Sequence, residues 1–456
     1  MNPVLLLNLV GLTPAMVTPD TPTLQELAQD GFMAPLGAVF PAVTCSAQTS
    51  MMTGLLPRDH GIVGNGWYFR ELGEVWLWRQ SNRLISGERL WERGRRRDPP
   101  FIFGNVFWWY AMNAEVDRLL TPRPVYLADG RKLPGIYGRP AGYRDAVEAA
   151  IGPFPLFDFW GPRAGLASSR WICEAALWTL ENDAPTVLQV YVPHLDYDLQ
   201  RFGPDAAASL QAHRDLDRCI RPLVLAAKHA GRRILVVSEY GIEAAEAPVH
   251  VNRALREAGL LEVYRQLDFE HLDPMASRAF AVADHQAAHV YVRREEDLAV
   301  TRRLLESLEG IAQVADRREQ AALGIDHPRA GEFVLVAKPG RWFSYYHWLD
   351  DARAPDYART VDIHRKPGYD PAELFLDPEK SWPTLRVAGK LLAKKLGFRT
   401  VMDLIPLRAE LVRGTHGRPV DDPARGPILM GCRRPERDGP YAMTDLPDLL
   451  LDLVFA

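Results

Sequence analysis

Thr44 is the residue whose setting most favours catalytic chemistry. The segment 40–65 reads FPAVTCSAQTSMMTGLLPRDHGIVGN, and Pro41 keeps the approach to Thr44 extended. We predict a helix through 45–53, and the exposed amides at its N-terminus favour an anion such as a phosphoryl oxygen. A hydroxyl there can be ionised by a bound cation and attack phosphorus. Thr is also a common N-cap and Asn-Gly a common turn, so a structural interpretation stays open.

A scaffold of alternating strands and helices is predicted to hold this segment. Apolar runs predict strands at 4–10, 187–193, 234–238, 289–292, 333–337 and 427–430, and apolar residues recur at helical spacing in 205–230 and 299–309. This alternation predicts an α/β fold of three layers, in which helices cover both faces of a mostly parallel central sheet. In such sheets the reactive side chains lie at the carboxyl ends of the strands.

Residues 66–165 differ in composition from the rest of the chain. They are rich in Trp, Tyr, Phe, Pro and Arg and lose the strand–helix rhythm; the tryptophans include Trp67, Trp76, Trp78, Trp91, Trp108 and Trp109. We predict that residues 1–65 and 166–456 form the catalytic core and that 66–165 is an inserted cap that shapes a pocket over the site. For any single Trp, a role in the core without ligand contact stays open.

Length and composition indicate a globular chain with one large core and room for an inserted subdomain: 456 residues, 47% of them hydrophobic. The formal net charge of −4 gives no general attraction to nucleic acid polymers or anionic membranes, so we expect neither as a partner. The four cysteines, at positions 45, 173, 219 and 432, show no CxxC spacing, which argues against a disulfide scaffold and a zinc ribbon.

The N-terminal residues are interpreted as a strand and not as a targeting segment. The apolar run at 4–10 is too short to span a membrane, and neither a basic region nor a small-residue cleavage site accompanies it. A short apolar run that ends at Gly11 is typical of a buried strand in a parallel sheet. We therefore predict a cytoplasmic protein.

Three ordered motifs resemble the nucleophile block of the nucleotide pyrophosphatase/phosphodiesterases, a family of the alkaline-phosphatase superfamily. They are Phe-Pro-x-x-Thr at 40–44, Thr-Gly-Leu-x-Pro at 53–57 and His-Gly-Ile-x-x-Asn at 60–65. The resemblance covers nearly the whole chain outside 66–165 and implies an alkaline-phosphatase-like fold. It also implies that Thr44 is the nucleophile that becomes phosphorylated or nucleotidylated, and that Asn65 hydrogen-bonds a phosphoryl oxygen.

The same resemblance implies two zinc-like ions, held by carboxylates and histidines from loops that follow successive strands. The segment 191–204 is similar to one ligand block, in which Asp196 matches the ligand Asp and Gln200 stands in place of the ligand His. The segment 237–242 is similar to another, in which Glu239 keeps the carboxylate and Tyr240 replaces the His. These departures leave the implied ligand set half matched.

Other positions bear on the same set. The ligand Asp expected on the first strand is Val10; Asn8, on the same side of that strand, could substitute weakly or be a buried hydrogen-bonded Asn. His416 matches the final metal histidine, while His364, in DIHRKPGYD, is a competing candidate and a possible recruited ligand. An oxygen-rich set of this kind favours Mg²⁺ or Mn²⁺ over zinc.

His285 is a further candidate, argued from its place in the sequence. Asp284 and His285 end the short apolar run 279–283, so they can reach the strand-end surface and supply a nitrogen that Gln200 and Tyr240 do not. A structural hydrogen-bonded His is the alternative interpretation.

We predict a metal-dependent hydrolase of small-molecule phosphoric esters, a phosphodiesterase, phosphatase or nucleotide pyrophosphatase that forms a covalent phospho-enzyme at Thr44. The expected cofactors are two divalent metal ions. They are Zn²⁺ or, given the oxygen-rich ligand set, Mn²⁺ or Mg²⁺. One alternative is a divergent superfamily member that hydrolyses or transfers a different ester in specialised metabolism. Another is an inactive relative that binds a ligand, which the presence of both Thr44 and Asn65 disfavours.

Overall fold

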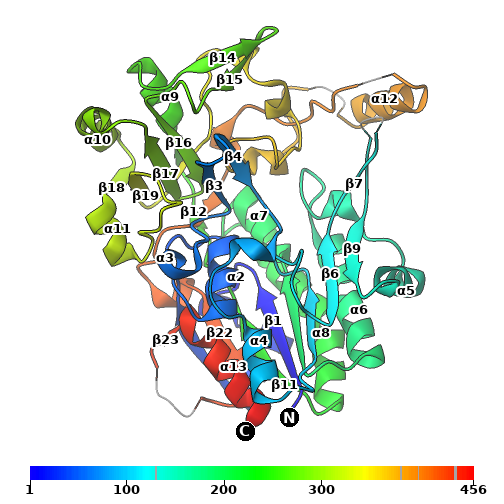
Figure 1. Cartoon of the computed structure of the whole chain (residues 1–456). Coiled ribbons are helices and arrows are strands. Elements are labelled where there is room, and N and C mark those ends of the chain that lie inside the picture. Colours follow the sequence, from blue (N-terminus) through cyan, green and yellow to red (C-terminus); the bar gives the residue numbers. More distant parts are fainter. Residues whose placement is uncertain (129–130, 381–382, 399, 436–438) are drawn as a thin grey trace.

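The structure is a computed structural model that describes residues 1–128, 131–380, 383–398, 400–435 and 439–456. A nine-stranded sheet forms its centre (Figure 1), in the order β23-β2-β22-β11-β1-β10-β5-β6-β9. Its strands are β1 (Val4–Leu9), β2 (Phe32–Gly37), β5 (Phe103–Val106), β6 (Arg118–Pro122), β9 (Ile136–Arg139), β10 (Val187–Val192), β11 (Arg233–Val237), β22 (Ile428–Gly431) and β23 (Tyr441–Ala442). The five strands from β11 to β6 run parallel, as predicted.

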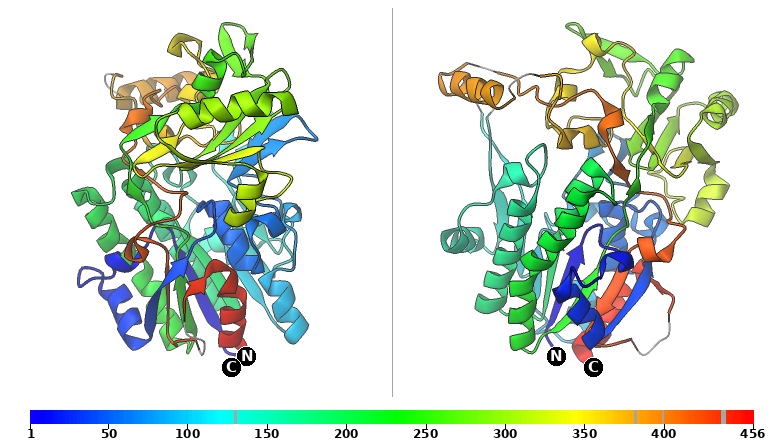
Figure 2. Two further views of the ribbon diagram at one scale, coloured as in Figure 1. Left: turned by 90° about the vertical axis from the view of Figure 1, so that its left-hand side faces the viewer. Right: turned by 180° about the vertical axis from the view of Figure 1, so that it is seen from behind.

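Helices cover both faces of this sheet, which confirms the three-layer α/β fold. One face carries α2, α4 and α13 and the other carries α1, α6 and α8 (Figures 1 and 2). Their bounds are α1 (Pro22–Asp30), α2 (Thr44–Thr53), α4 (Leu90–Arg97), α6 (Leu166–Asn182), α8 (Ala207–His229) and α13 (Leu446–Phe455). The central strand β1 is buried at every position, because helices cover a parallel sheet on both sides. No helix within the described residues is both long and apolar enough to cross a membrane.

A second, antiparallel sheet lies at the carboxyl ends of the central strands (Figure 1), in the order β16-β17-β19-β18. Its strands are β16 (Ala279–Asp284), β17 (Ala287–Val292), β18 (Ile311–Ala315) and β19 (Phe333–Ala337), and the helices beside it are α9 (Val251–Glu257), α10 (Leu298–Ser307) and α11 (Arg317–Leu323). The predicted strands at 289–292 and 333–337 exist, but they belong to this sheet and not to the parallel one. Burial alone does not reveal which partner an apolar strand will pair with.

Residues 66–165 contribute to both the centre and its cover. Strands β5, β6 and β9 fall inside this range and extend the central sheet, so the boundary drawn from composition does not coincide with the boundary of the sheet. The remaining elements within it are β3 (Gly66–Phe69), β4 (Glu74–Leu77), β7 (Val125–Tyr126), β8 (Lys132–Leu133) and α5 (Tyr143–Ile151). The hairpin of β3 and β4 reaches the second sheet, where Tyr68 packs edge-on against Phe280.

Short elements complete the described chain. They are α3 (Pro57–His60), α7 (His194–Phe202), β12 (Glu243–Ala244), β13 (Ala247–Val249), β14 (Val263–Gln266), β15 (Phe269–Leu272), β20 (Arg341–Phe343), α12 (Pro383–Lys395) and β21 (Gly414–Thr415). The pairing of β12 with β21 brings the segment after β11 beside the segment that contains His416. Gly414 also permits β21 to approach α7, since a Cβ there would lie 2.1 Å from the carbonyl oxygen of Leu199.

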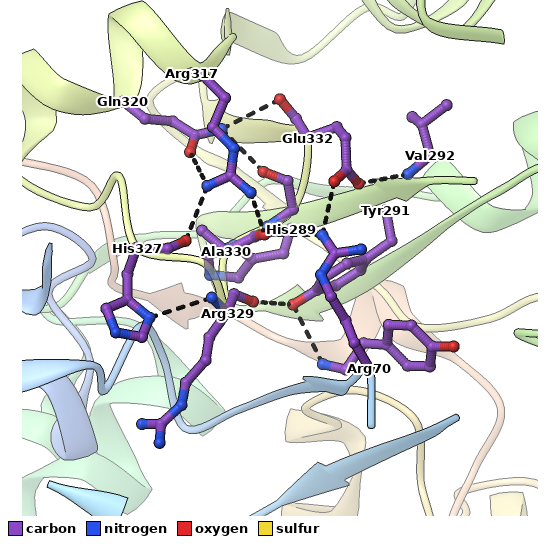
Figure 3. Close-up of polar contacts among 12 residues, drawn as sticks. Arg70, His289, Tyr291, Val292, Arg317, Gln320, His327, Arg329, Ala330 and Glu332 are labelled. Carbon is purple, nitrogen blue, oxygen red and sulfur yellow. Dashed lines mark hydrogen bonds and ion pairs between the residues drawn. The ribbon is translucent and has the colours of Figure 1, made fainter. Parts of the chain in front are cut away.

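A polar cluster on the second sheet includes His289 and Arg329 (Figure 3), and both also contact the segment that leads to Asn65. Arg329 donates through Nη1 to the carbonyl oxygens of Gly61, at 2.7 Å, and Leu84, at 2.8 Å. His289 Nε2 lies 2.9 Å from the carbonyl oxygen of Val63. The backbone at 61–65 is therefore held in place by residues more than 200 positions away in the chain.

Candidate active site

Thr44 lies where the carboxyl ends of the central strands meet the N-terminus of α2. It is the first residue of that helix, after an extended Val43, and only 4% of its surface is exposed. Its Oγ1 is 3.2 Å from the hydroxyl of Tyr240, and that hydroxyl donates to Asp196 Oδ1, also at 3.2 Å. Because the single phenolic proton points to Asp196, the Thr44 hydroxyl donates to Tyr240. A directed chain of hydrogen bonds thus runs from Thr44 to Asp196.

Glu239 follows β11 and is completely buried. Its Oε1 accepts from Asn8 Nδ2 and Gln48 Nε2, each at 2.6 Å. Its Oε2 and the Oδ1 of Asn8 have no hydrogen-bond partner among the described residues. Burial raises the pKa of Glu239 to about 8, although the hydrogen bonds from Gln48 and Asn8 oppose the shift. Two buried oxygens beside Thr44 are left without a partner.

Asp196 lies in the first turn of α7 and has both oxygens engaged. Oδ2 accepts from Gln200 Nε2 at 2.8 Å, one turn further along the helix, and Oδ1 accepts from Tyr240. The amide oxygen of Gln200 in turn accepts from the hydroxyl of Tyr369 at 3.0 Å. Burial raises the pKa of Asp196 to about 6, against the hydrogen bonds from Gln200 and Tyr240. Neutral donors therefore satisfy this carboxylate.

Four rings form a stack next to Asp196. The ring centroids are 3.5 Å apart for Tyr240 and His416, 3.8 Å for His416 and His285, and 3.6 Å for His285 and Tyr369. Burial lowers the pKa of both histidines well below its usual range, so both rings are neutral. His416 Nδ1 lies 2.9 Å from the carbonyl oxygen of Ala42, to which it must donate. That leaves its Nε2 as an acceptor, unpartnered among the described residues and 3.8 Å from Asp196 Oδ1.

Asn65 is held tightly beside the start of α2. Its Oδ1 accepts from the amide of Cys45 at 3.0 Å. Its backbone N and Nδ2 donate to Asp284 at 2.7 and 3.0 Å, and Asp284 Oδ1 is also 2.9 Å from Nδ1 of His285. Burial raises the pKa of Asp284 to about 6, despite these hydrogen bonds. Asp284 thus fixes the orientation of the Asn65 amide.

The predicted site residues separate into two groups. Contacts join Thr44, Asp196, Glu239 and His416, and His285 joins them through its ring contact with His416. His364 makes none of these contacts; its Nδ1 lies 3.5 Å from the carbonyl oxygen of Leu77. Two further residues belong to the site although their sequence context did not single them out. Gln48 could have been found from its position one helical turn after Thr44, whereas Tyr369 lies in the segment noted only for His364.

The donor groups do not fit the implied pair of zinc ions. A zinc site needs three or four protein ligands, but no group of three His, Cys, Asp or Glu in the described part of the chain is placed to hold a metal. Gln200 is committed to Asp196 and Tyr369, and the Tyr240 ring lies flat on His416. The unpartnered oxygens near Glu239 fit a harder cation instead, since Mg²⁺ needs few protein oxygens and completes its shell with water and substrate phosphate.

Half-buried aromatic side chains from the 66–165 region flank the site. The backbone N of Trp109 donates to Gln48 Oε1 at 2.7 Å. The ring of Trp109 lies 4.9 Å from that of Trp78, which in turn lies 6.2 Å from Tyr369. We call Trp78 and Trp109 the tryptophan pair.

Comparisons with known proteins identify the family and the fold of the chain. The family model described as type I phosphodiesterase / nucleotide pyrophosphatase matches residues 4–370. Phosphonoacetate hydrolase from Sinorhizobium meliloti 1021, in complex with phosphonoformate, has the same fold at 14% identity and a TM-score of 0.63, over 99% of this chain and 96% of that one. Murine ectonucleotide pyrophosphatase / phosphodiesterase 5, an inactive form in complex with AMP, aligns at 16% identity and a TM-score of 0.59, over 100% and 95%.

The human form of the latter protein aligns at 14% identity and a TM-score of 0.58, over 99% of this chain and 94% of that one. A sequence comparison with curated proteins gives no match. The structural likenesses establish the fold, and the family model covers most of the chain. The chain therefore belongs to the type I phosphodiesterase / nucleotide pyrophosphatase family of the alkaline-phosphatase superfamily, a family of hydrolases of phosphoric esters and phosphoanhydrides.

Proposed function

We propose that this protein hydrolyses a small-molecule phosphoric ester with the hydroxyl of Thr44 as nucleophile. The observation that carries the proposal is the position of that hydroxyl, at the first residue of α2 and at the head of the hydrogen-bond chain through Tyr240 to Asp196. Amides at the start of a helix favour the oxygens of a phosphoryl group. At Thr44 Oγ1 the protein thus provides both a path for the proton and helix amides that favour an anion.

The chain's own residues account for the proton movements. As Thr44 Oγ1 bonds to phosphorus, its proton passes to Tyr240 and the phenolic proton passes to Asp196, while the bond from phosphorus to the leaving oxygen breaks. The leaving alkoxide takes a proton from water. The hydroxide left by that water attacks the phosphothreonine, the bond from phosphorus to Thr44 Oγ1 breaks as phosphate leaves, and the proton on Asp196 returns through Tyr240 to the Thr44 oxygen.

Buried carboxylates on both sides of Thr44 would repel a phosphate unless positive charge is added. Asp196 and Glu239 are both buried, and their hydrogen-bond donors are neutral side chains. A divalent cation, when bound, supplies the charge that offsets the phosphoryl oxygens. Glu239 and Asn8 are the residues that would hold it. We therefore retain a metal-dependent reaction in the proposal, without the zinc pair.

The substrate is proposed to be a small phosphoric ester with an apolar or aromatic leaving group. The tryptophan pair offers a flat apolar surface. Trp109 contacts Gln48 through its backbone, and the ring of Trp78 lies next to that of Tyr369. Two of the similar structures hold phosphonoformate and AMP, which are small anions of related chemistry.

Substitution of Thr44 tests the proposal directly. With p-nitrophenyl phosphate and bis-p-nitrophenyl phosphate as substrates, Thr44→Ala should lose about 10³-fold or more in kcat, while Thr44→Ser should keep part of it. Acid quenching followed by mass spectrometry should detect a phosphoryl group on the Thr44 peptide. Thr53→Ala is the matched control, because Thr53 lies at the other end of α2 and bonds the Thr49 carbonyl oxygen. Undiminished turnover in Thr44→Ala would remove Thr44 as the nucleophile.

A further inference from the structure

We infer that the site binds a single hard divalent cation, Mg²⁺ or Mn²⁺, between the ends of β1 and β11, and that hydrogen bonds within the protein close the second ion position at Asp196. The inference deepens the proposed function, on which it rests for the role of the ion. It is argued from which donors in the site are satisfied and which are not.

The β1–β11 side has acceptors without donors. Asn8 and Glu239 are linked by one hydrogen bond of 2.6 Å, and each is left with one oxygen that is fully buried and unpartnered among the described residues. A buried acceptor without a partner costs about 1–3 kcal/mol. A cation removes that cost for both oxygens at once. The hydroxyl of Thr44, which adjoins the Glu239 carboxylate, is a third oxygen in reach of the same ion.

The Asp196 side has the opposite character. Both oxygens of Asp196 accept hydrogen bonds, from Gln200 and Tyr240. Both polar groups of Gln200 are used as well, because its Oε1 accepts from Tyr369. Among the described residues, His416 Nε2 beside Asp196 is left without a partner. An ion here would have to displace the phenol and the amide to gain one nitrogen and one carboxylate, which is too few protein ligands for a stable zinc site.

The identity of the donors sets the preference for metal. The open side presents carboxylate, amide and hydroxyl oxygens, which suit Mg²⁺ and Mn²⁺. The nitrogen donor nearest to Asp196, His416, has Tyr240 on one face of its ring and His285 near the other. Tyr240 and Gln200 therefore determine the metal specificity, since they stand where the resemblance implies metal ligands and instead donate hydrogen bonds to Asp196.

Isothermal titration of the chelator-treated full chain, without substrate, tests the inference. The wild type should bind one Mn²⁺ per chain, should bind Mg²⁺ at the same site in competition, and should take up no second ion when Zn²⁺ is added. Glu239→Gln, which keeps the shape of the side chain, should lower Mn²⁺ affinity by at least about tenfold. Asp196→Asn, the matched change on the closed side, should alter it less than about threefold.

Two further variants keep the test decisive if Glu239→Gln does not fold. Asn8→Asp adds a negative oxygen to the open side and should strengthen Mn²⁺ binding. Gln200→His combined with Tyr240→His should create the second position, so that this variant binds two ions and melts at a higher temperature with Zn²⁺. Two ions bound to the wild type, the absence of any Mn²⁺ or Mg²⁺ binding, or greater sensitivity to Asp196→Asn than to Glu239→Gln would overturn the inference. Because binding is measured without turnover, inactivity on phosphoric esters would contradict only the proposed function.

Discussion

The carboxylates of this site accept hydrogen bonds from neutral side chains, whereas in a metal centre they would bind a cation. Asp284 accepts from both the backbone and the amide of Asn65, so the orientation of that amide depends on a carboxylate from another sheet. His289 acts in a similar way on Val63, which lies two residues before Asn65. Its Nε2 donates to the carbonyl oxygen of Val63, and its Nδ1 accepts from the amide of Gly331 at 3.2 Å. A proton on Nδ1 would remove this second bond.

Protonation of His289 should therefore destabilise the fold in acid. Burial lowers the pKa of His289 to about 4, below the value of about 6.5 for an unfolded His. The stability it contributes is fully present above pH 6.5 and is lost as the pH falls toward 4. His289→Gln, which does not titrate, should lose roughly 2 kcal/mol less than the wild type between pH 7 and pH 5, measured by urea unfolding. His229→Gln, at an exposed position, is the control; equal losses in wild type and His289→Gln would contradict the assignment.

Helix α2 organises the site at the scale of elements. Its first residue is Thr44, its Cys45 amide holds Asn65, and its Gln48 joins Glu239 to the backbone of Trp109. Three functional contacts therefore leave one helix within two turns. Through the last of them the tryptophan pair is fixed relative to Thr44.

Removal of either ring of the tryptophan pair should weaken substrate binding more than chemistry. Trp78→Ala and Trp109→Ala should each raise KM for p-nitrophenyl esters about 3- to 10-fold, because an aromatic contact contributes roughly 0.5–1.5 kcal/mol. The backbone bond of Trp109 to Gln48 survives the change, so kcat should fall much less. Steady-state kinetics check this, with Trp178→Ala on α6 as the control. An unchanged KM in both variants would exclude the pair from the substrate site.

At the scale of the whole molecule, two sheets with separate cores must keep a fixed position relative to each other for the site to form. The second sheet delivers Asp284 and His285 at the turn between β16 and β17, where His285 takes a φ of 58°. The amide of Gln286 then donates to the carbonyl oxygen of His416 at 2.9 Å. Arg329 reinforces this docking through its bonds to the carbonyl oxygens of Gly61 and Leu84 and through its guanidinium, which lies 5.0 Å from the centre of the Trp67 ring.

Loss of the Arg329 side chain should loosen this docking. Arg329→Met removes two charge-assisted hydrogen bonds, so the free energy of unfolding should fall by about 2–4 kcal/mol. Hydrogen exchange should rise at residues 61–66. The control is Arg318→Met. Arg318 is an exposed arginine on α11, the helix beside the second sheet, and its loss should change neither quantity. A wild-type exchange pattern in Arg329→Met would show that the two sheets dock without this contact.

Local features of the sequence were enough to predict three neighbouring strands of the central sheet and the helix that begins at Thr44. The runs at 4–10, 187–193 and 234–238 are mostly apolar because helices cover both faces of the sheet, and this burial is visible in composition alone. The start of α2 at Thr44 was equally readable, because an extended proline segment followed by a helix-forming run is a local signal.

Contacts between distant residues were decided only by the tertiary structure. Sequence motifs offered His416 and His364 for the same position, but only His416 lies beside Asp196, because β21 pairs with β12. The partners of β5 and β6, inside the aromatic-rich region, were hidden for the same reason. Which strand an apolar segment joins, and which histidine reaches a carboxylate, depends on packing between parts of the chain hundreds of residues apart, and no local pattern of residues encodes that choice.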